Sequence, residues 1–315
     1  MKNALPIAIV AIGIALVAVP APAQQGSAPY TVEETGKGYS RLQEAIDAIG
    51  QGRGTIRFAS RAFRECAVQN AGEITYRAAI PGQSVLDGVA CEGKAALVLR
   101  GRSARLEGMV LSNIRVPDKN GAGIRLEKGD LFVTQTWFRD SEQGILTHDD
   151  RSSKIVIDKS TFTRLGTCEG GGGCAHSLYI GDYGSLTVTR SRFEAGRGGH
   201  YVKSRAGQVA VLNSSFDDTA GRGTNYMIDL SNGARGRIEG NWFVQGRDKE
   251  NYSVFIAVSA EGARNSSEGL IVRNNDARFA RGVSRDSIFL GDWSGDAILL
   301  EGNALDSRLS RYKRL

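Results

Sequence analysis

Residues 176–205 read HSLYIGDYGSLTVTRSRFEAGRGGHYVKSR and contain one complete copy of the unit from which most of the chain is built. Within this stretch, SLTVTRSRF (185–193) alternates apolar and polar residues before it reaches Ser191 and Phe193. Alternation with a period of two predicts a strand that has one buried face. The unit is therefore expected to be a short strand that ends in a turn.

The same nine-residue shape recurs along the chain. The copies are DLFVTQTWF (130–138), KIVIDKSTF (154–162), SLTVTRSRF (185–193), QVAVLNSSF (208–216) and RGRIEGNWF (235–243), with looser ones in GLIVRNNDA (269–277) and DAILLEGNAL (296–305). Successive closing phenylalanines lie 24, 31, 23 and 27 residues apart. A drifting period in this range, carried by strands with no helical pattern between them, is typical of a solenoid of parallel strands stacked ~4.8 Å apart.

Stacking would place equivalent residues of successive coils in columns. The aligned copies give an aliphatic column for the interior: Val133, Ile157, Val188, Val211, Ile238, Val272 and Leu300. They also give a small polar column: Thr136, Ser160, Ser191, Ser214, Asn241, Asn275 and Asn303. We expect the polar column to hydrogen-bond along the axis at a corner of the coil, and the closing phenylalanines to stack on one another. The sequence thus predicts an all-β fold, a single-stranded parallel β-helix.

The first residues predict an export signal. Met1–Asn3 is a short basic start, Ala4–Val19 is apolar, and Ala21-Pro22-Ala23 is a small-residue cleavage site, so residues 1–23 are expected to be a signal peptide. The alternative, a membrane anchor, needs a longer apolar run than this proline-interrupted one. We expect residues 24–315 to form one β-helix domain that is secreted or periplasmic and monomeric, with no stable membrane insertion after cleavage.

The charge balance is mildly basic, with 40 Lys and Arg against 34 Asp and Glu. An exported protein of this kind suits an acidic polysaccharide or an anionic surface, although the charge could also serve solubility alone. We expect no nucleic-acid partner, because the sequence has no recognition-helix pattern and no paired-aromatic sheet motif.

The four cysteines agree with export. We predict two disulfides, Cys168–Cys174 within CEGGGGC and Cys66–Cys91. A zinc site is the competing explanation, but the spacing matches no ligand pattern. No cofactor is predicted; carboxylates at the bends could hold calcium, but none is assigned to them.

One helix is expected, at about residues 40–49, where Leu42, Ala45, Ile46 and Ile49 fall on one face. Ser40 and Gln43 fit a capping box, and Gly50 supplies the stop. Such a helix would cover the open end of the coil and its unpaired strand edge. The basic end RLSRYKRL (308–315) either shields the opposite edge or forms a tail.

A capping helix YSRLQEAIDAI (39–49), followed by TIRFA (55–59) and by coils that end in V-x-x-[STN]-x-F, resembles the right-handed parallel β-helix proteins of the pectate-lyase-like superfamily. The resemblance covers roughly residues 30–307. It implies a right-handed coil. It also implies an activity among polysaccharide lyases, glycoside hydrolases, esterases, epimerases and proteins without known activity.

Polar side chains collect on three consecutive coils. The segments HSLYIGD (176–182), HYVKSRA (200–206) and YMIDLSN (226–232) align as strands, and their apolar residues are expected to point inward. The intervening residues then form two outward columns about 5 Å apart from coil to coil. One column is His176, His200 and Tyr226, and the other is Tyr179, Lys203 and Asp229. We assign candidate catalytic roles to Lys203, His200, His176 and Arg205, and candidate substrate-binding roles to Tyr179, Tyr201, Tyr226 and Asp229.

Stacked imidazoles repel each other when both are charged, so at least one of the two histidines should be neutral near neutral pH. Arg205 is expected to lower the pKa of Lys203 toward a range useful for proton abstraction, while Asp229 opposes that shift. A purely structural arrangement is the alternative: Lys203 pairs with Asp229, and the histidines bond to carbonyls at the bend.

Lys203-Ser204-Arg205 also resembles the Lys-Ser element of β-helical lyases that cleave alginate or chondroitin-type glycans. This resemblance implies an elimination in which Lys203 is the base, Arg205 binds the uronate carboxylate, and His200, His176 or Tyr179 is the acid. One feature departs from the pattern, because those lyases carry an arginine on the next coil, where this chain has Asp229-Leu230-Ser231.

The sequence therefore predicts a protein that acts on or binds an extracellular acidic polysaccharide, with β-elimination as the leading enzymatic hypothesis. A glycoside hydrolase is the second hypothesis, because carboxylates at the bends could form a catalytic pair. Those carboxylates are Asp149, Asp150, Asp182, Asp217, Asp218 and Glu261. A non-catalytic glycan-binding or surface scaffold is the third.

Overall fold

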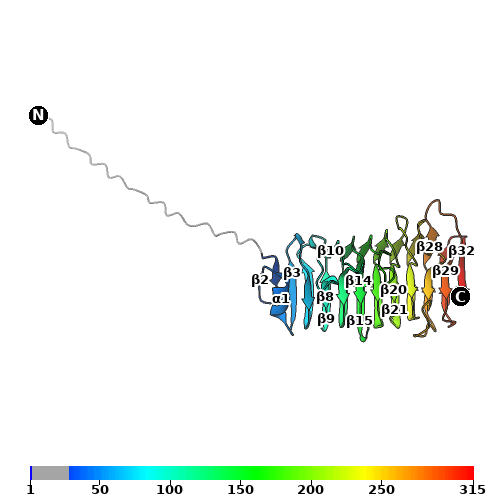
Figure 1. The fold of residues 1–315 in the computed structure, drawn as a ribbon, viewed down its shortest axis with the longest axis horizontal. Coiled ribbons are helices and arrows are strands. Elements are labelled where there is room, and N and C mark those ends of the chain that lie inside the picture. Colours follow the sequence, from blue (N-terminus) through cyan, green and yellow to red (C-terminus); the bar gives the residue numbers. More distant parts are fainter. Residues whose placement is uncertain (2–27) are drawn as a thin grey trace.

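The computed structural model describes Met1 and residues 28–315, so the predicted signal peptide lies outside the described residues. The chain winds into coils that follow one another along a single long axis (Figure 1). Equivalent strands of successive coils pair into three long sheets, here named A, B and C. The predicted all-β, right-handed parallel β-helix is confirmed.

Sheet A has 12 strands, and its two antiparallel pairs are β1 with β2 and β1 with β3. In spatial order its strands are β2 (Lys37–Tyr39), β1 (Tyr30–Val32), β3 (Arg53–Phe58), β6 (Glu73–Ala78), β9 (Ser103–Glu107), β12 (Asp130–Thr134), β15 (Asp150–Asp158), β18 (Tyr183–Thr189), β21 (Gln208–Leu212), β24 (Arg235–Glu239), β27 (Ile271–Arg273) and β30 (Leu299–Glu301).

Sheets B and C have ten parallel strands each. Sheet B consists of β4 (Ala62–Phe63), β7 (Ser84–Asp87), β10 (Met109–Ser112), β13 (Trp137–Arg139), β16 (Thr161–Thr163), β19 (Arg192–Glu194), β22 (Ser215–Asp217), β25 (Trp242–Gln245), β28 (Asp276–Phe279) and β31 (Ala304–Leu305). Sheet C consists of β5 (Ala67–Gln69), β8 (Ala95–Leu99), β11 (Ala122–Leu126), β14 (Gln143–Thr147), β17 (Leu178–Ile180), β20 (Val202–Ser204), β23 (Ile228–Leu230), β26 (Val254–Val258), β29 (Ser287–Asp292) and β32 (Leu309–Arg314).

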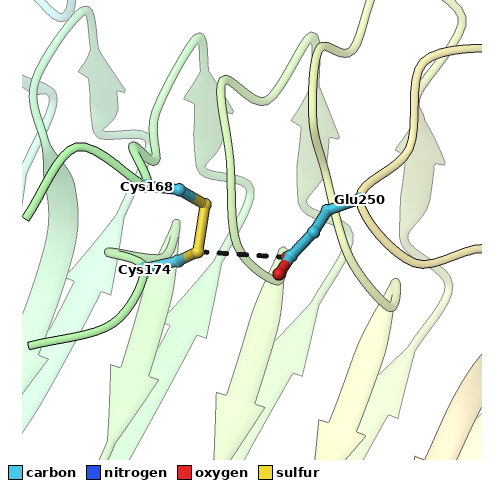
Figure 2. A group of neighbouring side chains, drawn as sticks. All are labelled: Cys168, Cys174 and Glu250. Atoms are coloured by element: carbon cyan, nitrogen blue, oxygen red, sulfur yellow. Dashed lines mark hydrogen bonds between the residues drawn. A yellow bond between two sulfur atoms is a disulfide. The ribbon is translucent and has the colours of Figure 1, made fainter.

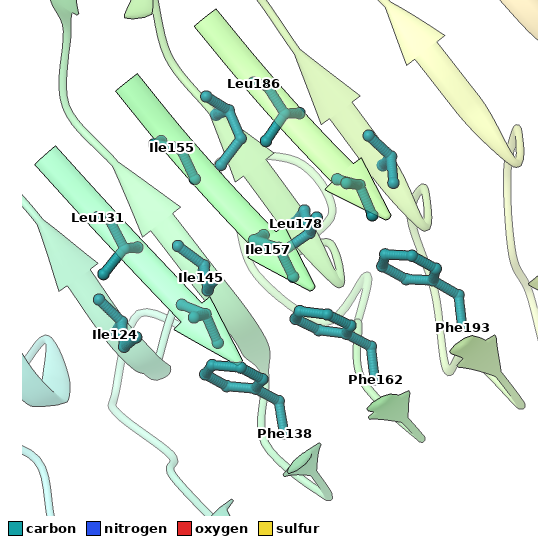
Figure 3. Packing of buried hydrophobic residues seen from close by; sticks show 14 of the residues in the cluster. Ile124, Leu131, Phe138, Ile145, Ile155, Ile157, Phe162, Leu178, Leu186 and Phe193 are labelled. Atoms are coloured by element: carbon teal, nitrogen blue, oxygen red, sulfur yellow. The ribbon is translucent and has the colours of Figure 1, made fainter. Parts of the chain in front are cut away.

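The interior between the three sheets is filled by the predicted columns. The aliphatic column from Val133 to Leu300 is in register on sheet A, one residue per coil. On sheet B the phenylalanine rings from Phe138 to Phe243 stack with centroids 4.7–4.9 Å apart and planes 4–17° from parallel. Figure 3 shows Phe138, Phe162 and Phe193 in this row beside the aliphatic side chains. Ring spacing matches strand spacing, so each coil adds one ring to a continuous dry core.

The small polar column forms a ladder at the corner between sheets A and B. In each step the backbone N–H of one member donates to the side-chain oxygen of the member on the next coil, at 2.9–3.3 Å, from Thr136 to Asn303. The residue before each member turns the chain in the left-handed region even where it is not glycine, as at Gln135, Lys159 and Arg190, each with φ 48°. The ladder satisfies buried N–H groups that this corner takes out of the sheets.

Replacement of Asn275 by Ala should destabilise the protein by about 1–3 kcal/mol, because it leaves buried donors on the neighbouring coil without an acceptor. Asn275 Oδ1 accepts from the backbone N–H of Asn241 at 2.9 Å and from its side-chain amide at 3.0 Å. Urea denaturation of the variant measures the loss. Lys128→Ala, at an exposed position, is the control. A loss no larger than that of the control would contradict the ladder's role.

The N-terminal end of the coil is covered by α1 (Leu42–Ile49), as predicted (Figure 1). The helix begins two residues later than expected, and the predicted capping box is wrong. Glu44 accepts from Ser40 Oγ at 3.2 Å and from the Arg41 backbone N–H at 3.3 Å. Gln43 instead bonds the backbone of Val68, at 2.9 and 3.0 Å, because it faces the first coil.

The C-terminal basic segment forms β32, which pairs in parallel with β29 and ends sheet C. Its arginine and lysine side chains are exposed along this last edge, where charge opposes pairing with another chain. Among the described residues, no helix has the length and apolarity to cross a membrane.

Candidate functional site

The candidate site lies on the outer face of sheet C, where β17, β20 and β23 are neighbours. The register pairs Tyr179 with Lys203 and Lys203 with Asp229, so the predicted column of these three residues is confirmed. The apolar residues of the same strands, such as Leu178 and Val202, are fully buried on the opposite face. Strand alternation therefore brings polar groups from segments about two dozen residues apart into contact.

The two histidines and Tyr226 form the second predicted column, with His176 and His200 ring centroids 4.9 Å apart and His200 and Tyr226 centroids 5.2 Å apart. His176 Nδ1 accepts the backbone N–H of His200 at 2.9 Å, and His200 Nδ1 accepts that of Tyr226 at 3.1 Å. These contacts differ from the carbonyl bonds of the structural alternative. Because Nδ1 is the acceptor in both rings, each neutral imidazole carries its proton on Nε2.

Gly199 makes the close approach of the two histidines feasible. It has φ +61°, and a Cβ at this position would lie 2.4 Å from His176 Nδ1 and 2.2 Å from the carbonyl oxygen of Ala175. A larger residue would therefore displace His176 from the backbone N–H that holds it.

Both histidines are held neutral. Burial lowers the pKa of His176 well below its ordinary value, and a proton on the adjacent His200 would lower it further. The charges of Lys203 and Arg205 act in the same direction. Burial also lowers the pKa of His200, with the charge of Lys203 as the next cause. The predicted neutral imidazole is thus present at both positions, and each presents an N–H donor.

Stability should fall as the pH drops below about 6.5, the ordinary histidine value, because the unfolded chain then binds protons that the buried rings do not. Above that pH the histidines are neutral in both the folded and the unfolded chain, so they cause no loss of stability. The slope approaches 1.4 kcal/mol per pH unit for each histidine, at most. Chemical denaturation at pH 7 and 5 measures it in the wild type and in the His176→Asn/His200→Asn variant, whose amide oxygens can still accept the backbone N–H. His148→Asn, at an exposed position, is the control. An unchanged slope in the double variant would contradict the burial of neutral rings.

Lys203 is the centre of the ionic contacts. Its Nζ donates to Asp229 Oδ2 at 3.0 Å and to Glu261 Oε1 at 2.5 Å. The side chains of Lys203 and Asp229 are 7% and 3% exposed, whereas that of Glu261 is 42% exposed. The Lys203–Asp229 pair of the structural alternative is therefore present, but it has a solvent-facing third member.

The expected lowering of the Lys203 pKa is wrong. Burial alone would lower the pKa, but the negative charges of Asp229 and Glu261 outweigh burial and raise it above the ordinary lysine value. Lys203 is consequently a firmly protonated ammonium group. It suits a proton donor or an electrostatic partner and not a resting base.

Arg205 and Glu261 form the exposed side of the cluster. One terminal nitrogen of Arg205 donates a hydrogen bond to Glu261 Oε2 at 2.5 Å, and the other donates to the hydroxyl of Tyr179. The guanidinium carbon lies 5.0 Å from the centre of the Tyr179 ring. Burial alone would raise the pKa of Glu261, but Lys203 and Arg205 lower it below the ordinary value. Glu261 is thus an ionised carboxylate held between two cations.

A pocket of about 450 Å³ opens over this cluster. It is lined by Gly172, Gly173, Cys174, His176, Tyr179, Gly199, His200, Lys203, Arg205, Asn225, Glu250 and Glu261. Five predicted site residues therefore share one pocket: His176, Tyr179, His200, Lys203 and Arg205. Asp229 lies behind Lys203, with Oδ1 buried and without a hydrogen-bond partner, so it positions the lysine.

The predicted substrate-binding role of Tyr201 is wrong, because this side chain does not reach the pocket. Its side chain is 1% exposed and points into the interior, where its hydroxyl donates to Asp218 Oδ1 at 2.6 Å. The chain bends between Gly199 and Val202, so two consecutive side chains, Tyr201 and Val202, face inward. Asp218 also forms an ion pair with Lys249, with 3.2 Å between Oδ2 and Nζ. Both of these side chains are 0% exposed.

Of the six bend carboxylates, Glu261 lines the pocket. Asp150 accepts from Ser152, Ser153 and the Gly129 backbone, Asp149 accepts from the Asp182 backbone, and Asp182 pairs with Arg151. Glu250 and Asn225 were missed, since they come from bends of unequal length that show no repeat. Glu250 Oε2 accepts from the Asn225 amide at 2.9 Å.

Both predicted disulfides are present, Cys66–Cys91 and Cys168–Cys174. The second closes the glycine-rich loop that forms one wall of the pocket, and Figure 2 shows it facing Glu250, whose Oε2 is 3.9 Å from Cys174 Sγ. Cys168, Cys174 and Glu250 are also the one group of potential metal ligands among the described residues. Because both sulfurs are bonded to each other, neither is available as a thiolate ligand.

The model of the "Right handed beta helix region" family matches residues 95–304, two thirds of the chain. The chain belongs to the right-handed β-helix family. This β-helix protein has no significant match among curated proteins. Among solved structures it is similar to Geobacillus virus E2 ORF18, with 14% identity and a TM-score of 0.50 over 87% of this chain and 57% of that one. It thus spans little more than half of that viral protein.

A second solved structure is an alginate lyase from Paenibacillus sp. str. FPU-7, with 16% identity and a TM-score of 0.50 over 86% of this chain and 94% of that one. At such low identities these two similarities establish the fold of the β-helix protein and not its activity.

Proposed function

We propose that this β-helix protein is exported and cleaves an extracellular polysaccharide that contains uronate units, at the sheet C pocket. The observation that carries the proposal is the Lys203–Glu261–Arg205 array, in which two cations hold one exposed carboxylate inside the pocket. The similarity in fold to an alginate lyase supports a polysaccharide substrate. The two disulfides support export, as does the predicted signal peptide.

The reaction that these groups fit is β-elimination beside a uronate carboxylate. Arg205 binds that carboxylate, and Glu261 removes the proton on C5. The C–H electron pair becomes the C4–C5 double bond as the bond from C4 to the glycosidic oxygen breaks, and Lys203 donates a proton to the departing oxygen. The hydrogen bond between Lys203 and Glu261 then returns the proton from the base to the acid.

This scheme exchanges the roles expected from the sequence. Lys203 is the acid because Asp229 and Glu261 keep it protonated. In the free protein Glu261 is a weak base, since Lys203 and Arg205 lower its pKa. A substrate carboxylate on Arg205 places a second negative charge beside Glu261 and strengthens it as a base, so proton abstraction is coupled to binding of a uronate.

The two histidines act as donors. With Nδ1 held by the backbone, each ring carries its N–H on Nε2. His200 Nε2 lies 3.5 Å from the buried Asp229 Oδ2, so His176, which also lines the pocket, is the better donor to a sugar hydroxyl or ring oxygen. Their neutral state avoids adding further positive charge next to Lys203.

Glycoside hydrolysis is a second candidate, because Glu250 and Glu261 line the same pocket and could act as an acid and a base. Incubation with alginate, pectate and glycosaminoglycans tests both. Ultraviolet absorbance from unsaturated uronides supports elimination, whereas new reducing ends without that absorbance support hydrolysis. A thermal shift with no cleavage supports a glycan-binding scaffold, and neither cleavage nor binding overturns the proposal.

A further inference from the structure

The pocket has two ends of different character. Strands of sheet C run in parallel, so the residues that precede them share one edge of the sheet and those that follow share the other. Cys174, Asn225 and Glu250 precede β17, β23 and β26, whereas Arg205 and Glu261 follow β20 and β26. We name the end formed by the first group the entry end and the end formed by the second group the exit end; both names refer to the direction of the strands.

Two positively charged donors serve the exit end: Arg205, which belongs to it, and Lys203, which lies beside it in β20. The entry end holds no charged donor of the pocket lining: beside the neutral histidines, it offers the carboxylate of Glu250 as an acceptor. Glu250 is exposed, and its carboxylate contacts the Asn225 amide and the disulfide, neither of which carries charge. Lys249, the nearest lysine in sequence, is turned into the interior and paired with Asp218. The Asn225 amide is itself used internally, since Oδ1 accepts the Tyr226 backbone N–H at 2.9 Å.

We infer that Glu250 is a specificity-determining residue that selects a heteropolysaccharide, in which the uronate at the exit end is joined to an uncharged sugar at the entry end. The inference rests on the proposed function and narrows its substrate class. A hydroxyl or amide N–H of an uncharged unit can donate to the free oxygen of Glu250. A second uronate would bring like charge to Glu250, whose carboxylate contacts no cation among the described residues.

The test compares kcat/KM for an alternating polymer, unsulfated chondroitin or hyaluronan, with kcat/KM for the homopolyuronates alginate and polygalacturonate. The wild type should favour an alternating polymer at least about fivefold, the factor equivalent to the Coulomb energy of two charges about 4 Å apart in water. Glu250→Gln should remove this preference, Glu250→Lys should reverse it, and high salt should reduce it in the wild type only.

Glu169→Gln is the matched control, because Glu169 belongs to the same disulfide loop but does not line the pocket. A wild-type preference for homopolyuronates, or a preference that Glu250→Gln leaves unchanged, would overturn this inference and leave the proposed function standing. Absence of cleavage and binding with every polymer would overturn both.

Discussion

Glu261→Gln is expected to lower kcat/KM on a uronate-containing polysaccharide by about 10²–10⁴-fold, the usual contribution of a positioned proton-transfer group. The amide keeps the size of the side chain, but its single oxygen can accept from only one of Lys203 and Arg205, and it cannot take a proton. Since Glu261 is 42% exposed, the melting temperature should change little. Steady-state assays and thermal unfolding of the same preparation measure both effects.

Glu301→Gln is the control for this variant, because Glu301 is 51% exposed on β30 of sheet A, away from the pocket. Lys203→Ala is a poorer test, since it would leave buried Asp229 without a counter-ion and so mix lost stability with lost chemistry. If Glu261→Gln keeps kcat/KM within threefold of the wild type (~0.7 kcal/mol), Glu261 is not the base.

Asp218→Asn is expected to destabilise the protein by about 3–5 kcal/mol, because it leaves the Lys249 ammonium buried without a counter-ion. Both side chains are 0% exposed. The substitution also turns an amide N–H toward donors, since Asp218 accepts from Tyr201 at 2.6 Å and from Thr224 at 2.8 Å. Chemical denaturation measures the change in the free energy of unfolding.

The neighbouring residue supplies the matched control. Asp217 is 27% exposed and accepts the Thr219 backbone N–H, a bond that an asparagine oxygen can keep, so Asp217→Asn should cost less than about 0.5 kcal/mol. Adding Lys249→Met to Asp218→Asn should restore part of the lost stability, because the orphan charge is removed. Equal effects of the two asparagine variants would show that the buried pair does not matter.

The sequence was sufficient for the columns because a solenoid converts a sequence period into contacts. Once Val188 and Phe193 were aligned with their equivalents, the core, the polar ladder and the stacked histidines followed from one spacing. The corners were less visible. Gln135, Lys159 and Arg190 adopt left-handed φ at one corner. Glutamine, lysine and arginine rarely take this conformation, so the sequence did not predict it.

The charges of the pocket depend on parts of the chain that do not repeat. Glu250 and Glu261 come from bends of unequal length, and Glu261 reaches Lys203 across 58 residues of sequence. Because the sequence does not reveal the contact with Glu261, it predicted that Arg205 would lower the pKa of Lys203. Tyr201 could not be assigned from alternation, since the bend after Gly199 turns two successive side chains inward.

The most direct test of the central claim is the mass of the products formed from a purified uronate-containing oligosaccharide. Elimination at the Lys203–Glu261–Arg205 array predicts two fragments whose masses sum to that of the substrate, one of which absorbs in the ultraviolet, and their loss in Glu261→Gln. Fragments that together are one water heavier than the substrate would contradict elimination. Unchanged product formation in Glu261→Gln would contradict the assignment of the site.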